Sequence, residues 1–327
     1  MIIPLAASVL LALTPAKICP FGGEAEAWTR VALEAWDRLD HERIHMTNPS
    51  TPGLVLFDDS CVYRFTPRAD GAFEAGGRVY AVRSDSHSGE IALPDGETIP
   101  ARKLSFAAPT ADGSMYFVMA LPSVWRADIR ETRDPEHLAM LVFMHEFAHT
   151  QQGSGLGRKI DALITRGLPG DADDDSIQKA WEGNPAYVAA YREELDLLYR
   201  AAGAPDKESR RALLAEAADR IHIRRERFLG DQPLWREADD LFLTFEGSGN
   251  WAAWAWLTDA RGGGMTAEQA TTLVRGSKRW WSQDAGLGLM LTLDGLTPDW
   301  PSLTFGPNGV TADDLIARAL QPSRSSE

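Results

Sequence analysis

Positive charge is scarce in this sequence. The 327 residues include 33 lysines and arginines against 47 aspartates and glutamates, which gives a net charge of −14. A nucleic-acid-binding surface needs a concentration of basic side chains, so this balance argues against a nucleic-acid partner. The one basic cluster, Arg224-Arg225-Glu226-Arg227, is interrupted by a glutamate, and we interpret it as a solvated helix face.

The sequence also lacks an apolar run long enough for a stable membrane span. The apolar stretch within residues 1–16 is about a dozen residues long, which is too short for a bilayer but fits the core of a signal peptide. We expect cleavage after Ala16 and export to the periplasm or the extracellular space. Because no lysine or arginine precedes the stretch, an uncleaved N-terminal anchor and a cytosolic start stay open as alternatives.

Cysteine is nearly absent, since the chain has only Cys19 and Cys61. Both would remain after the expected cleavage, so a single disulfide bond can form in an oxidising compartment. Two unpaired thiols are the alternative.

No internal repeat is visible, and the length suits one large or two modest domains. Residues 24–45 predict an amphipathic helix. Short apolar runs separated by Asp-Gly turns then predict strands. These runs lie at residues 54–57, 61–65, 78–82 and 114–121.

From residue 134 the pattern is helical almost to the end of the chain, apart from an acidic loop at 167–175. Residues 153–157, rich in glycine, are expected to end the first of these helices. Further helices are expected near residues 175–183, 185–202, 207–229, 234–259, 265–275 and 279–295. We therefore predict an α+β fold. Its parts are an N-terminal lobe at 17–130 of one helix and a small, mostly antiparallel sheet, a mostly helical lobe at 131–321, and a disordered tail at 322–327.

The most informative stretch is residues 138–152, which read LAMLVFMHEFAHTQQ. His145 and His149 are four residues apart, so they lie on the same face of a helix. Asp134 and Pro135 suit the first positions of that helix. Two imidazoles and the Glu146 carboxylate in so apolar a helix need a partner, and a metal ion is the simplest one. The two histidines could take two corners of a Zn²⁺ tetrahedron, with Glu146 beside the ion as general base.

The sequence His145-Glu146-Phe147-Ala148-His149, flanked by uncharged residues, resembles the signature of the zincin metallopeptidases. The resemblance covers about a dozen residues, and Gln151 stands where the family usually has a hydrophobic residue. It implies a zincin-like fold with Zn²⁺ between two lobes and a peptide or protein substrate. It also implies a sheet edge above the metal to which an extended substrate adds as a further strand. The run at 114–121 could be that edge or an ordinary core strand.

A second copy of the same pattern, His41-Glu42-Arg43-Ile44-His45, serves as an internal control. The apolar stripe of its helix includes Trp28 and Leu39, and at about 100° per residue His41 and His45 point away from that stripe. Arg43 adds a charge inside the pattern. We interpret this copy as a solvated helix face.

The third metal ligand is expected to be a glutamate on a later helix, as in the gluzincin branch of the family, because no third histidine follows at short range. Glu246 is the preferred candidate, since it is a lone carboxylate in a strongly apolar stretch. Asn250, one turn later, could accept the N–H of a ligating histidine. Gly247 and Gly249 would let this helix approach the metal helix. The 96 residues between His149 and Glu246 imply a long insertion.

Other residues stay open as alternatives at this stage. Glu182, Glu193 and Glu194 lie nearer to the histidines in sequence and could each supply the third ligand instead of Glu246. Tyr187 and Tyr191 could place a phenol over a tetrahedral intermediate, although core or rim packing is the preferred interpretation.

The sequence thus predicts an exported zinc metallopeptidase in which Glu146 takes a proton from the attacking water. A zinc-dependent hydrolase of another substrate, or a zinc-stabilised binding protein on the same scaffold, is the second interpretation. A secreted helical interaction protein with an accidental motif is the third.

Overall fold

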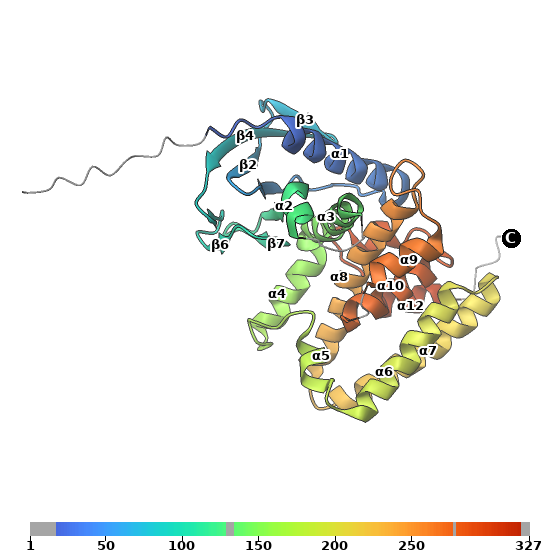
Figure 1. The fold of residues 1–327 in the computed structure, drawn as a ribbon. Coiled ribbons are helices and arrows are strands. Elements are labelled where there is room, and N and C mark those ends of the chain that lie inside the picture. The colour runs from blue at the N-terminus through green and yellow to red at the C-terminus, as the bar shows by residue number, and fades with distance from the viewer. Residues whose placement is uncertain (1–17, 129–133, 277–278, 322–327) are drawn as a thin grey trace, which may run out of the picture.

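The computed structural model describes residues 18–128, 134–276 and 279–321. They form an α+β fold in which α1, α2 and α3 lie against a mixed sheet at one end, and most of the other helices lie at the opposite end (Figure 1). The helices are α1 (Gly23–Leu39), α2 (Pro122–Asp128), α3 (Pro135–Gln152), α4 (Arg158–Thr165), α5 (Ser176–Trp181), α6 (Pro185–Ala202), α7 (Lys207–Leu229), α8 (Pro233–Thr258), α9 (Ala267–Arg275), α10 (Trp281–Asp294), α11 (Trp300–Thr304) and α12 (Ala312–Leu320). The predicted leader, the lobe boundary near residue 130 and the tail fall outside the described residues.

The strands form a six-stranded sheet in the order β3-β4-β2-β1-β8-β7 and a separate two-stranded sheet, β5-β6. Only β1 and β8 run parallel in the larger sheet, so the prediction of a mostly antiparallel sheet is confirmed. The strands are β1 (Gly53–Phe57), β2 (Cys61–Pro67), β3 (Phe73–Ala75), β4 (Arg78–Ser86), β5 (Glu90–Ala92), β6 (Thr98–Pro100), β7 (Ser105–Pro109) and β8 (Met115–Ala120).

The structure excludes one of the two interpretations of the run at 114–121, namely that it is an edge strand of the sheet. β8 lies between β1 and β7, and its residues from Tyr116 to Ala120 are almost fully buried, so the run at 114–121 is a core strand. The edge belongs to β7, where Ala107 pairs with Phe117 of β8. The segment SFAAP gave no strand signal because it is short and shows no polar alternation.

Helix α3 lies between the sheet and α8. Its N-terminus forms as predicted, with the Asp134 side chain accepting the N–H groups of Glu136 and His137. Phe143 and Phe147 stack on each other at 5.1 Å and meet Phe117 of β8 edge-on. This aromatic packing fixes the rotation of α3, and with it the direction in which the metal-binding motif points.

The glycine-rich residues 153–157 do not end the helical path. They form a π-helical turn that leads directly into α4, because Gly155 lies against the backbone of Gly306 and Gly309 and is held there by packing. The disulfide bond is confirmed, as Cys19 and Cys61 are joined with an S–S distance of 2.01 Å. Among the described residues, no helix combines the length and apolar character that a bilayer crossing requires.

Gly247 and Gly249 allow α8 to pack closely against two neighbouring helices, but only one of these glycines faces α3 as predicted. A Cβ atom on Gly247 would lie 2.6 Å from Cα of Gly286, so this glycine serves the contact with α10. A Cβ atom on Gly249 would lie 3.1 Å from Nδ1 of His145 and 3.1 Å from Cε1 of His149. Only Gly249 therefore brings α8 up to the histidines of α3.

Candidate metal centre

Two histidines and one glutamate converge in the buried interface between α3 and α8. Nε2 of His145 lies 3.2 Å from Nε2 of His149 and 3.2 Å from Oε2 of Glu246. Nε2 of His149 lies 3.5 Å from Oε1 of Glu246. All three side chains are buried. The fold thus brings Glu246 to the two histidines in spite of the long separation in sequence.

Hydrogen bonds on the far side of each imidazole fix which nitrogen carries the proton. Nδ1 of His145 donates to Oδ1 of Asn250 at 2.9 Å, and Nδ1 of His149 donates to Oε1 of Gln152 at 2.8 Å. The amide nitrogens of Asn250 and Gln152 donate to main-chain carbonyls of α10 and α8, which sets the orientation of both amides. In the neutral imidazoles, both Nε2 atoms therefore present lone pairs toward the carboxylate.

A cation between three acceptor atoms this close together would stabilise them. Ligand bonds of about 2.0–2.1 Å to a tetrahedral ion place neighbouring ligand atoms about 3.3 Å apart. The observed separations of 3.2, 3.2 and 3.5 Å match such an arrangement. The ligand atoms of His145, Glu146 and His149 all lie within 4.8 Å of one another, so this group could hold a metal ion.

A proton can substitute for the metal in the same cluster. Burial lowers the pKa of His145, but the hydrogen bond and the charge of Glu246 outweigh it and raise that pKa to about 9. Burial lowers the pKa of His149 to about 4, against the charge of Glu246. Burial alone would raise the pKa of Glu246, but the two histidines outweigh it and lower that pKa. The cluster is therefore built around one positive charge.

Glu146 is half-buried beside this cluster. Burial raises the pKa of its carboxyl group to about 7; the charge of His145 opposes this shift, and the charges of Glu246 and Asp174 add to it. A carboxyl group with a pKa near neutrality can both accept and release a proton.

Gln152 is the supporting residue that the sequence analysis missed. Its side chain is fully buried, and besides His149 it contacts Ser248 of α8, with Nε2 lying 2.5 Å from Oγ. The ring of Phe245 stacks on His149 at 4.1 Å. The sequence did contain one indication of this role. Two glutamines end an apolar helix, and a buried amide there must find hydrogen-bond partners.

Replacing Gln152 with leucine should weaken the binding of a metal ion at this site by about 10- to 100-fold, because His149 loses the acceptor that fixes its tautomer and ring orientation. The adjacent Gln151 provides a matched control, as it is equally buried but bonds to the backbone of Ser50 instead of the site. Competition with a chromophoric chelator measures both affinities. Equal effects of Gln151→Leu and Gln152→Leu would contradict the assignment.

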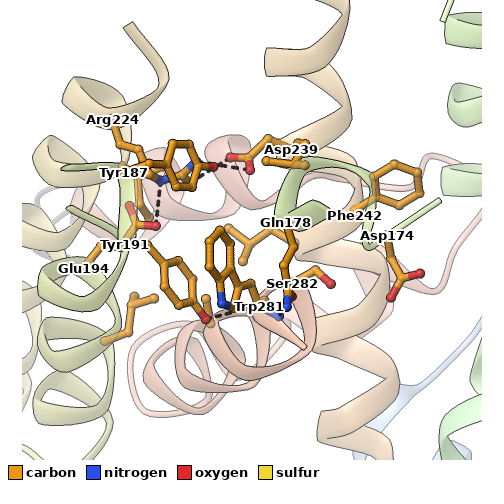
Figure 2. Close-up of a pocket in the computed structure, with 15 residues that line it drawn as sticks. Asp174, Gln178, Tyr187, Tyr191, Glu194, Arg224, Asp239, Phe242, Trp281 and Ser282 are labelled. Atoms are coloured by element: carbon orange, nitrogen blue, oxygen red, sulfur yellow. Dashed lines mark hydrogen bonds and ion pairs between the residues drawn. The ribbon is translucent and has the colours of Figure 1, made fainter. Parts of the chain in front are cut away.

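The other third-ligand candidates lie elsewhere. Glu182 is exposed at the end of α5, and Glu193 is exposed and pairs with Arg220 of α7. Glu194 is buried, but its Oε1 accepts a hydrogen bond from Arg224 at 2.8 Å (Figure 2).

The second copy of the motif also lies away from the site, as predicted. His41 and His45 are both exposed, and Glu42 pairs with Arg261 on the surface. The copy lies in a π-helical turn that ends at His45, whose φ of 61° puts it in the left-handed region. Its two imidazoles are therefore not held on one face of an α-helix.

Tyr187 and Tyr191 belong to an aromatic stack, which confirms packing as their role. Tyr191 stacks on Trp281 at 4.7 Å and donates its hydroxyl to the Trp281 carbonyl. The hydroxyl of Tyr187 accepts a hydrogen bond from Arg224 at 2.6 Å (Figure 2). Both phenols are committed to these contacts.

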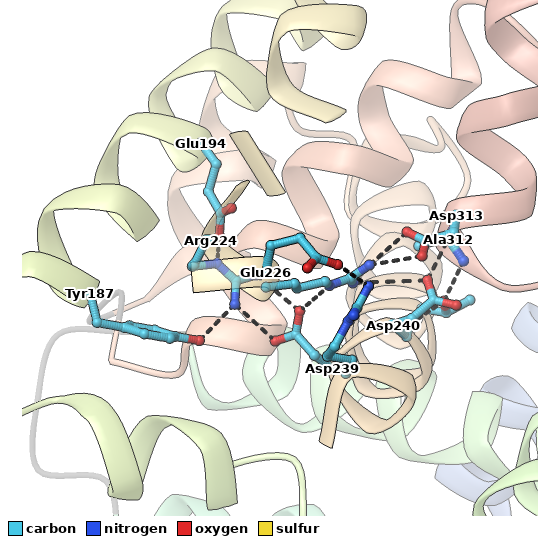
Figure 3. Close-up of polar contacts among 11 residues, drawn as sticks. Tyr187, Glu194, Arg224, Glu226, Asp239, Asp240, Ala312 and Asp313 are labelled. Atoms are coloured by element: carbon cyan, nitrogen blue, oxygen red, sulfur yellow. Dashed lines mark hydrogen bonds and ion pairs between the residues drawn. The ribbon is translucent and has the colours of Figure 1, made fainter. Parts of the chain in front are cut away.

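The interpretation of the basic cluster as a solvated helix face is wrong for two of its three arginines. Arg224 and Arg225 are about 95 % buried, and both bind Asp239 of α8 (Figure 3). Arg225 also reaches Asp313 of α12 at 2.7 Å. Their partners come from three other helices, so the local sequence of α7 could not reveal the burial. Arg227 is exposed, as expected.

Comparisons of the chain with protein-family models, with curated proteins and with solved structures find no match.

Proposed function

We propose that the chain is a zinc-dependent metallopeptidase of the zincin type. In this proposal His145, His149 and Glu246 hold Zn²⁺, and Glu146 is the general base. The observation that supports it most directly is the set of three acceptor atoms separated by 3.2 to 3.5 Å, with the imidazole protons directed away from them. Two nitrogen ligands and one carboxylate are a common set for catalytic zinc, which keeps a fourth position for water.

Zn²⁺ bound there supplies a Lewis acid that makes water a nucleophile at neutral pH. Glu146 takes a proton from the water as the water oxygen attacks the peptide carbonyl carbon. When the C–N bond breaks, Glu146 passes this proton to the leaving amine. Asn250 and Gln152 keep the two imidazoles in the orientation that this arrangement needs.

The edge strand β7 favours a peptide over other substrates. It is the last strand of the sheet, and α3 packs directly against it. A strand with one free edge can pair with an extended peptide through main-chain hydrogen bonds. Such pairing would place the peptide bond to be cleaved beside α3, the helix that carries Glu146.

Metal content measured by mass spectrometry tests the proposal. We expect one zinc ion per chain in the wild type and loss of stoichiometric zinc in His145→Ala and in Glu246→Ala, because each variant removes one of three ligands. His41→Ala and Glu193→Ala are the matched controls from the second motif copy and from the excluded ligand candidates, and both should retain zinc.

Wild-type protein without zinc would overturn the proposal. Zinc without hydrolysis of any member of a broad peptide library would instead favour a zinc-dependent hydrolase of another substrate or a zinc-stabilised binding protein.

A further inference from the structure

A cavity with aromatic walls lies beside the metal centre, between α5, α6, α7, α8 and α10 (Figure 2). The cavity has a volume of about 30 Å³. A volume of that size admits one or two waters, so an occupant must be slender or must displace a ring. The apolar walls include Tyr187, Tyr191, Phe242, Leu243 and Trp281.

The cavity and the metal centre share two helices. Leu243 lines the cavity, and Glu246 lies one turn further along α8. Ser282 lines it at the start of α10, and the side chain of the next residue, Gln283, bonds to Glu246. Asp174 also lines the cavity, and its charge acts on Glu246 and on Glu146. A substrate held at the metal could therefore extend a side chain into the cavity.

Three side chains of the lining, those of Arg224, Gln178 and Tyr191, donate hydrogen bonds to protein partners. Arg224 donates through all three of its nitrogens, to Glu194, Tyr187 and Asp239. Gln178 donates its amide to a main-chain carbonyl, and Tyr191 does the same with its hydroxyl.

Acceptors are left over. Glu194 is 2 % exposed, yet within the described part of the chain its Oε2 has no hydrogen-bond partner. Oγ of Ser282, a hydroxyl that can either accept or donate, also has no partner there. A buried carboxylate oxygen without a donor is costly, which points to a ligand that brings a hydrogen-bond donor. Ammonium and guanidinium groups have that property.

The charged side chains around the inner end of the cavity also favour a cationic ligand. Glu194 and Asp239 line this end of the cavity against one guanidinium group, that of Arg224 (Figure 3). Asp174 adds a further carboxylate on the opposite side of the cavity in Figure 2. An entering cation is thus attracted from both ends, and its methylene stem can lie against aromatic rings.

We propose that this cavity binds the side chain of a lysine or arginine residue of the substrate, with the cationic tip at Oε2 of Glu194 and the stem against Tyr191 and Trp281. The identity of the occupant as a substrate residue rests on the proposed function. The binding site itself can be tested without hydrolysis.

n-Pentylamine, 1-pentanol and 4-ethylphenol are suitable probes for titration by NMR, since they represent a cationic, a neutral and an aromatic side chain. We expect n-pentylamine to bind at least tenfold more tightly than the other two. Glu194→Gln should reduce its affinity at least tenfold, and Asp174→Asn should do so if Glu194→Gln fails to fold. Glu193→Gln and Asp171→Asn, exposed neighbours that do not line the cavity, should leave it unchanged.

Equal binding of n-pentylamine and 1-pentanol, or tighter binding of 4-ethylphenol, would overturn the inference. If the protein binds n-pentylamine but contains no zinc and hydrolyses no peptide, the proposed function is overturned and the cation site is retained. Zinc-dependent hydrolysis without a preference for lysine over norleucine would overturn the subsite while leaving the proposed function intact.

Discussion

Replacing Glu146 with glutamine should lower kcat/KM for peptide hydrolysis by about 10²- to 10⁴-fold while leaving zinc content unchanged. Glutamine has nearly the same shape but cannot take a proton from water. His145, His149 and Glu246 are untouched by the change, so the metal should stay in place. The measurement is kcat/KM with a peptide that the wild type cleaves, together with the zinc content of the same preparation.

The chain offers a matched control for this experiment. Glu42 has the same position in the second motif copy but is exposed and paired with Arg261. Glu42→Gln should therefore leave kcat/KM unchanged. Full activity of Glu146→Gln with bound zinc would remove Glu146 from the mechanism, and loss of zinc in that variant would mean that Glu146 is itself a ligand.

The candidate site was largely predictable because its chemistry conflicts with its surroundings. His145, His149 and Glu246 are polar groups in helices that are otherwise apolar, and such groups need partners wherever the helices pack. The sequence could therefore single out the two histidines and favour Glu246 over other glutamates without knowing the path of the chain between them. It could also reject the second motif copy, because the apolar stripe of α1 shows which face of that helix is solvated.

Residues whose role depends on distant segments could not be predicted in this way. Arg224 and Arg225 read as an ordinary charged helix face, and only carboxylates from α6, α8 and α12 make their burial possible. β7 becomes a strand because β8 offers it a free edge. Asp174 lies in a loop whose sequence is merely acidic, and its relation to Glu246 arises from tertiary packing.

Replacing Arg224 with leucine should destabilise the fold by about 3–5 kcal/mol, since it leaves Glu194 and Asp239 buried without one of their cations. Asp239 indicates how this loss depends on pH. Burial would raise its pKa, but Arg224 and Arg225 outweigh it and lower the pKa to about 2. A lowered carboxyl pKa contributes stability that is present above the unfolded pKa of 3.8 and is lost as the pH falls toward 2.

The difference in unfolding free energy between wild type and Arg224→Leu should therefore be largest near pH 7 and shrink below pH 4, where the stranded carboxylates can be protonated. Urea unfolding at both pH values measures it. Arg220→Leu, on the same helix, breaks only the exposed pair with Glu193 and should cost less than about 1 kcal/mol. If both variants lost the same small amount, the buried network would contribute no more to stability than a surface ion pair. In that case the uncompensated oxygen of Glu194 would have to be hydrated, which would also weaken the argument for a cationic occupant of the neighbouring cavity.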